Sequence, residues 1–183
     1  MHNFAILFDS KNWAMKIKMV CLLLCSIYYT QMNGLADNGK KTLLLIHEVK
    51  CPKVQAYAYF IDFEKFGKIH PVIKETKRIK DPVGNSMGIY SIKEHIFLFG
   101  FIPLNPRYNA EVIEDEKGRR IVYTSQVKKN LYLEIVFSFS EENEKTKIRE
   151  EVTVTGNTFI CWMFRRQIKK MHLLLIENLK KEI

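Results

Sequence analysis

The sequence predicts an α+β fold, in which a curved antiparallel sheet packs against one long C-terminal helix. From residue 42 onward, apolar and polar side chains alternate in successive short segments, which is typical of half-buried strands. Two short helical segments follow the first strand, and residues 159–181 form one helical segment without Pro or Gly. The 183 residues suit one ordinary domain, and a composition that is 47% hydrophobic and 12% aromatic excludes a disordered or collagen-like chain.

The first strand is expected at residues 43–51 and ends at Pro52, because proline has no N–H to donate to a ladder. Residues 52–62 predict a short helix, and residues 64–70 predict a second one that ends before Pro71. The side chains expected to face inward from these helices are Val54, Ala58, Ile61, Phe66 and Ile69.

Six further strands are expected to form a meander. Residues 131–139 alternate most clearly, with Leu133 and Ile135 against Tyr132 and Glu134. Residues 100–106 form an apolar loop whose two prolines keep it out of a continuous ladder. The expected strands cover residues 72–81, 87–99, 108–114, 121–127, 131–139 and 147–155.

The C-terminal helix, for which Thr158 is the expected N-cap, carries an apolar stripe with members three and four residues apart. One face must therefore be buried over about six turns. A strongly twisted sheet cannot contact a straight helix along its whole length, so we expect a cavity between them that suits an apolar ligand. The stripe consists of Ile160, Phe164, Ile168, Met171, Leu175 and Leu179.

Short motifs mark the junctions within residues 42–183. The first strand ends in Val49-Lys50-Cys51-Pro52, Asp62 follows the first helix, and His70-Pro71-Val72 leads into the second strand. In this order they resemble the START-like, or Bet v 1-like, superfamily (SRPBCC, helix-grip fold), which includes polyketide cyclase-like and lipid-transfer proteins. Cys51 replaces the family's usual Ala, and His70 stands where a bulkier aromatic is common. The resemblance implies a seven-stranded sheet gripping the last helix around a hydrophobic cavity for lipids, steroids, quinones or polyketides.

Residues 1–40 precede the domain expected at residues 41–183. An uncharged, mostly apolar run of eleven residues, 19–29, is shorter than the roughly 20 needed to cross a bilayer but suits a signal peptide. Translation from Met1 or Met15, with cleavage before Asp37, would give an exported or membrane-tethered protein. Translation from Met32 would leave a cytoplasmic one, and a buried extra helix is the third alternative.

The formal charge of +9 does not indicate a nucleic-acid partner, because the basic pairs are dispersed and no zinc, glycine-rich or RNA-binding motif accompanies them. The five histidines stand singly and no CxxC occurs, so we expect neither a metal site nor a cofactor. Cys51 and Cys161 either pair, if the chain is exported, or remain buried free thiols.

Polar residues in the middle of strands are the candidates for catalysis, because facing a cavity is costly for them unless they are paired. The acidic ones are expected to face solvent, as alternation predicts for Glu134. His95 shares its side of the strand with Phe97, so it is either a weak candidate acid or base or a hydrogen-bonded core residue. No triad can be assembled. The candidates are Glu94, His95, Glu111, Tyr123 and Glu134, with His95 and Glu111 as weak catalytic candidates.

The cavity wall is expected to combine residues of the sheet, the first short helix and the C-terminal helix, although the helix residues would equally suit an ordinary core. The apolar loop that runs from Phe97 to Leu104 is expected either to contact a membrane surface or to fold over the cavity as a lid. The predicted ligand-binding residues are Phe60, His95, Phe97, Phe99, Tyr108, Tyr123, Phe137, Met163, Phe164, Met171 and Leu175.

The sequence therefore predicts a monomer that binds a small hydrophobic or lipid-like ligand between its sheet and its last helix, as a carrier or sensor. The alternative is an enzyme of the polyketide cyclase or dehydratase type that uses a His or Glu in the cavity. If two titratable side chains lie within hydrogen-bond reach inside the cavity, the carrier function is no longer favoured over the enzyme. A collapsed cavity would exclude both functions.

Overall fold

The structure is a computed structural model that describes residues 38–98, 101–116 and 118–183. Residues 1–37 of the predicted leader, with its three alternatives, lie outside the described residues, and so does Phe99, whereas residues 38–40 form the start of the first strand.

The predicted α+β architecture is confirmed. The main sheet contains β1 (Asn38–Val49), β2 (Ile73–Lys80), β3 (Ser86–Glu94), β6 (Arg107–Glu116), β7 (Arg120–Lys128), β8 (Leu131–Glu142) and β9 (Lys145–Asn157). A separate hairpin contains β4 (Ile96–Leu98) and β5 (Ile102–Leu104). The helices are α2 (Lys53–Ile61), α3 (Phe63–Ile69) and α4 (Thr158–Glu182).

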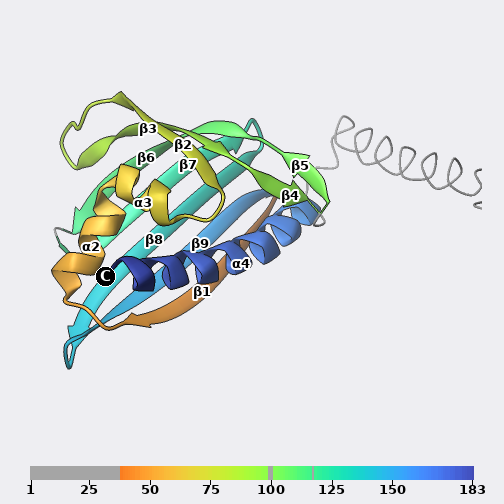
Figure 1. Ribbon diagram of the computed structural model, residues 1–183. Helices are drawn as coiled ribbons and strands as arrows, with labels where there is room; N and C mark the ends of the chain where they lie inside the picture. Colours follow the sequence, from red (N-terminus) through yellow and green to blue (C-terminus); the bar gives the residue numbers. More distant parts are fainter. Residues whose placement is uncertain (1–37, 99–100, 117) are drawn as a thin grey trace, which may run out of the picture. The chain divides into compact units, whose positions relative to one another are not determined.

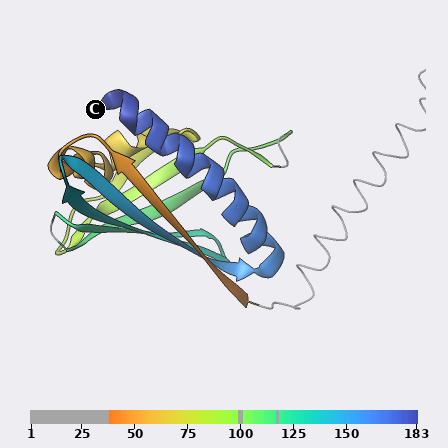
Figure 2. The same ribbon diagram turned by 90° about the horizontal axis from the view of Figure 1, so that it is seen from below.

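The seven strands are antiparallel in the order β1-β9-β8-β7-β6-β3-β2. Strands β2, β3, β6, β7, β8 and β9 thus follow the predicted meander, and β1 forms the far edge by pairing with β9. Helix α4 runs diagonally across one face of this sheet (Figures 1 and 2). Helices α2 and α3 lie near the end of α4 where the chain ends, and the β4–β5 hairpin lies toward the end where α4 begins (Figure 1).

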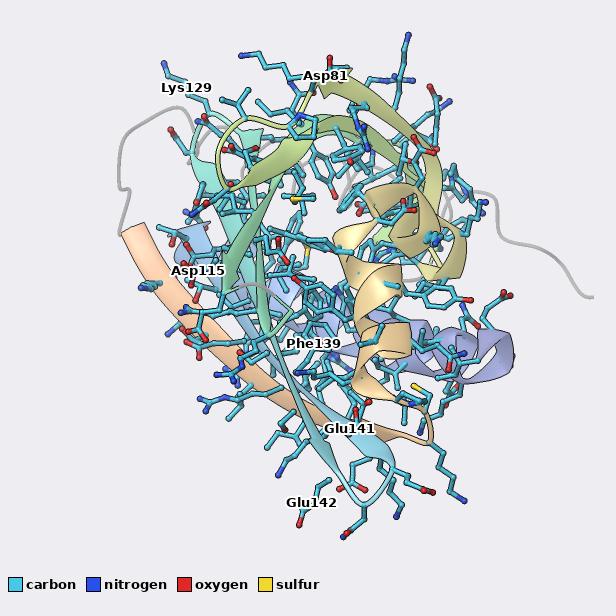
Figure 3. The ribbon with its side chains drawn as sticks, turned by 90° about the vertical axis from the view of Figure 1, so that its left-hand side faces the viewer. Asp81, Asp115, Lys129, Phe139, Glu141 and Glu142 are labelled. Carbon is cyan, nitrogen blue, oxygen red and sulfur yellow. The ribbon has the colours of Figure 1, made fainter. Side chains whose placement is uncertain are left out.

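The core fills the space between the sheet and the three helices. An aromatic cluster joins α2 to the sheet: the ring of Phe60 lies 4.7 Å from that of Phe137 and 5.3 Å from that of Phe139. Figure 3 shows Phe139 between the sheet and α2, whereas Glu141 and Glu142 lie at the far end of the β8–β9 hairpin. Aromatic side chains bury large areas, so this cluster fixes α2 against the middle of the sheet.

Three local expectations differ from the structure. The buried side of α2 is formed by Ala56 and Phe60, while Val54 is 76% exposed, because the large ring of Phe60 sets the orientation of this short helix. The strand expected at residues 87–99 ends at Glu94, where the backbone N–H of Glu94 donates to Pro106 and that of His95 to Val72. The chain after His95 then folds back on itself as the β4–β5 hairpin. The N-cap of α4 is Asn157, whose side chain accepts from the N–H groups of Phe159 and Ile160.

Within the described residues, Cys51 and Cys161 are both buried free thiols. Among the same residues, no helix is sufficiently long and apolar to cross a bilayer.

Candidate ligand-binding site

A cavity of about 120 Å³ lies between the sheet and α4. It is bounded by the inner faces of β3, β6, β7 and β8, by α3, by the β4–β5 hairpin and by the first half of α4. Its wall is mostly apolar, because it is formed by the inward side of the sheet and the apolar stripe of α4. The apolar lining residues are Phe63, Phe66, Ile73, Ile92, Ile96, Phe97, Leu104, Pro106, Ala110, Val127, Leu133, Ile135, Met163, Phe164, Ile168 and Met171.

Two titratable side chains of the wall form a hydrogen-bonded pair. The Tyr108 hydroxyl, on β6, donates to Oε1 of Glu94, the last residue of β3, over 2.6 Å. Both residues are half-buried as a whole, but part of that exposed surface faces the cavity. Burial raises the pKa of the Glu94 carboxyl, an effect that the hydrogen bond from Tyr108 opposes, and burial also raises the pKa of Tyr108 well above its usual value.

A second polar group connects α4 to the sheet. His172, on α4, lines the cavity, and its Nδ1 is hydrogen-bonded to Oε1 of Glu150 on β9. Glu150 is completely buried, and its other carboxylate oxygen lies 3.5 Å from Nε2 of His47 on β1. Burial alone would raise the pKa of Glu150, but the charge of His172, its hydrogen bond to Glu150 and the nearby His47 imidazole outweigh burial and lower this pKa to about 2.

His70 is a third polar part of the wall, which also contains Ser125 and Gln167. It caps the C-terminus of α3, where its backbone N–H donates to the Phe66 carbonyl over 3.0 Å. Its ring packs against that of Phe66 and lies perpendicular to that of His172, with 5.6 Å between the two imidazole centroids. Burial, together with the nearby charge of His172, lowers the pKa of His70 to about 3, so this imidazole is neutral at physiological pH.

The structure brings part of the predicted wall together. Of the predicted residues that lie in the described part of the chain, those that line the cavity are Phe97, Tyr108, Tyr123, Met163, Phe164 and Met171. Tyr123 is also buried in the core, where its hydroxyl donates a hydrogen bond to the Phe60 carbonyl.

The remaining predicted residues lie elsewhere. Phe60, Phe137 and Leu175 are completely buried in the packed core and do not reach the cavity. His95 follows the end of β3, where its Nδ1 lies 2.7 Å from Oδ1 of Asn105 and its ring contacts Phe97, so it is a hydrogen-bonded residue beside the cavity mouth. Glu111 alternates with the buried Ala110 and Val112 and therefore faces away from the cavity.

The polar residues that the sequence analysis did not place in the site are Glu150, His47, His70 and His172. Three of them carry a signal in the alternation. Glu150 occupies an inward position between Ile148 and Val152, His47 follows Leu45 on the inward side of β1, and His172 lies four residues after Ile168. His70 carries no such signal, because its position depends on how the end of α3 meets α4. No group of three or more His, Cys, Asp or Glu side chains in the described part of the chain could hold a metal ion.

The mouth of the cavity lies beside the β4–β5 hairpin, where Phe97 and Leu104 both line the cavity and remain 45% and 38% exposed. Phe101, further along the same hairpin, is 71% exposed. These exposed apolar side chains fit either of the roles predicted for this segment.

The cavity and the helix that closes it define a class of protein, the helix-grip α+β domains. No family model and no curated protein matches the sequence. Three of the solved structures that match are the Zhui aromatase/cyclase from Streptomyces sp. R1128, a START superfamily protein from Mycobacterium smegmatis, and Ara h 8.0201.

The aromatase/cyclase has a TM-score of 0.64 at 9% identity, over 79% of this chain and 93% of its own. The START protein has a TM-score of 0.60 at 14% identity, over 79% and 97%. Ara h 8.0201 has a TM-score of 0.59 at 12% identity, also over 79% and 97%. At these identities the likeness establishes the fold alone, and the predicted START-like, or Bet v 1-like, fold is confirmed.

Proposed function

We propose that this domain binds a small, mostly apolar molecule in the cavity between its sheet and α4. The observation that carries the proposal is a cavity of about 120 Å³ with a largely apolar wall. An apolar cavity of about 150 Å³ in another protein takes up benzene, so the present space suits a molecule of about one ring. A lipid, steroid or polyketide would require α4 and the β4–β5 hairpin to separate, because sites for larger ligands occupy roughly 300–1,000 Å³.

Toluene is a suitable probe of this cavity. We expect saturable binding of toluene to the full chain in an NMR titration, because transfer of toluene from water to an apolar cavity is favourable. Ala110 is buried in the wall, and Ala110→Leu fills part of the space, so this variant should weaken toluene binding at least roughly tenfold. Ala58→Leu, on α2 and outside the wall, is the matched control and should leave binding unchanged. Equal affinities for all three proteins would contradict the proposal.

The fate of the bound molecule is open between carriage and chemistry. Glu94 and Tyr108 are hydrogen-bonded to each other in the wall. His172 is hydrogen-bonded through Nδ1 to Glu150, as the imidazole of a general base often is to a carboxylate. Two titratable side chains therefore do lie within hydrogen-bond reach in the cavity wall, as the alternative function requires. A carrier is then no better supported than an acid–base enzyme of the polyketide cyclase or dehydratase type.

Exchange of the α-hydrogens of cyclohexanone in D₂O separates the two functions. In an acid–base enzyme, Glu94 or His172 would remove an α-proton and solvent would return a deuteron. The full chain should then accelerate the exchange, measured by NMR, and Glu94→Gln or His172→Gln should reduce the acceleration roughly 100-fold. If the protein is a carrier, exchange in the presence of the wild-type chain should be no faster than exchange in the presence of Ala110→Leu, whose cavity is partly filled.

Membrane contact through the exposed side chains of Phe97, Phe101 and Leu104 stays a prediction. Such contact would deliver an apolar ligand directly to the cavity mouth. Co-sedimentation of the full chain with anionic vesicles tests it, and no difference between the wild-type chain and Phe101→Ser would contradict it.

A further inference from the structure

The polar groups of the cavity wall differ in whether the protein satisfies them. Tyr108 donates to Glu94, the Ser125 hydroxyl donates to the Asn109 carbonyl over 2.9 Å, and His172 is bonded to Glu150. The ring of His70, by contrast, makes no hydrogen bond with any part of the chain that the structure describes, and its Nδ1 is completely buried without a partner. His70 is only 6% exposed, so bulk water does not satisfy it either.

An unpaired buried polar group is destabilising, and native proteins retain such groups mostly where they serve a function. The ring of His70 lies in the wall beside His172 and within the same cavity as Glu94 and Tyr108. Nδ1 itself has no accessible surface, so a ligand reaches it only when the ring, which no hydrogen bond from the described residues holds, turns within the wall. A hydrogen bond supplied there would remove an existing cost as well as gain a contact.

The charges around His70 restrict the chemistry of that ligand. An anionic ligand would be repelled by Glu94 when it is ionised, and the charge of His172 is already offset by Glu150, to which it is hydrogen-bonded. A cationic ligand would find Glu150 already surrounded by His172 and His47. A neutral imidazole has one donor and one acceptor nitrogen, and a hydroxyl group can pair with either of them.

We propose that the cavity selects an uncharged, hydroxyl-bearing molecule of about one ring, whose hydroxyl group pairs with the His70 imidazole. This inference rests on the proposed binding function. It adds an orientation, with the hydroxyl at the His70 end and the apolar body against Ala110, Met163 and Phe164.

Phenol and toluene test the inference, because they have nearly the same shape and differ in one hydroxyl group. In a purely apolar cavity, phenol would bind roughly tenfold or more weakly than toluene, because its hydroxyl would lose water without replacement. We expect the full chain to bind phenol at least as tightly as toluene in an NMR titration at pH 7, and not to bind benzoate.

Variants of His70 locate the effect. His70→Phe should weaken phenol binding at least roughly tenfold more than it weakens toluene binding, and His70→Asn, which retains a hydrogen-bonding group, should restore part of the phenol affinity. His95→Phe, at a histidine outside the wall, is the control and should change neither ligand.

The outcomes separate this inference from the proposed function. Toluene binding with phenol bound tenfold more weakly by the wild-type chain would overturn the inference and leave the binding function intact. A phenol affinity that does not depend on His70 would do the same. Binding of neither ring would contradict both, and the wild-type comparison decides the question even where a variant does not fold.

Discussion

Replacing Glu150 by glutamine is expected to lower the free energy of unfolding by about 3–5 kcal/mol. Glu150 is completely buried on β9 and is the shared partner of His172 on α4 and His47 on β1. Glutamine keeps the shape but removes the charge, so two buried imidazoles lose their anionic partner. Removal of one member of a buried ion pair is costly because the remaining groups stay desolvated. Urea-induced unfolding at pH 7, followed by circular dichroism, measures the change.

The next residue of the same strand provides the control. Glu151 points to the opposite face, where its carboxylate lies 3.7 Å from the Arg149 guanidinium and both side chains are about half exposed. Exposed pairs of this kind contribute roughly 0–1 kcal/mol, so Glu151→Gln should change stability by no more than about 0.5 kcal/mol. In the double variant Glu150→Gln/His172→Gln, the loss should be smaller than the sum of the single losses. Equal effects of the two glutamate variants would show that the buried group does not stabilise the fold.

The periodicity of the sequence was sufficient to predict the sheet and α4, because each is long enough for burial to repeat on one side. The alternation through β8 and the stripe from Ile168 to Leu179 both appear as predicted. The wrong face of the short α2 was predicted to be buried. A helix of nine residues has too few apolar positions to show whether Val54 or Phe60 faces inward, and the packing of Phe60 on Phe137 determines it. The end of β3 at Glu94 depends on hydrogen bonds to Val72 and Pro106, which no local pattern reveals.

The site was less predictable than the fold. Tyr108 and Tyr123 could be assigned to the wall because the side of a strand follows from alternation. Glu150 and His172 occupy inward positions that the same rule identifies, but their pairing joins residues on β9 and α4. The contact between His70 and His172 depends on the angle at which α3 meets α4, a tertiary property that neither segment encodes alone.

Acidification from pH 7 to pH 4.5 is expected to reduce the stability of the domain by about 2–3 kcal/mol through His70. Its pKa is lowered by burial, and further by His172, from 6.5 to about 3. The folded state therefore favours the neutral ring. This contribution is complete above the unfolded pKa of 6.5 and is lost as the pH falls from there toward 3. The pKa of Glu150 is lowered from 4.5 to about 2, so its contribution is lost only below about pH 4.5.

The variant His70→Phe isolates this effect from the other groups that face His70. Glu94 acts in the opposite direction, because burial raises its pKa, so acidification restores stability that its ionisation costs in the folded state. The informative quantity is therefore the difference in unfolding free energy between the wild-type chain and His70→Phe, measured in urea at pH 7, 5.5 and 4.5. We expect the wild-type chain to lose about 2–3 kcal/mol relative to the variant across this range, and His95→Phe to follow the wild type. Parallel pH profiles of the wild-type chain and His70→Phe would mean that His70 is protonated as readily in the folded as in the unfolded chain, and would contradict the lowering of its pKa by burial.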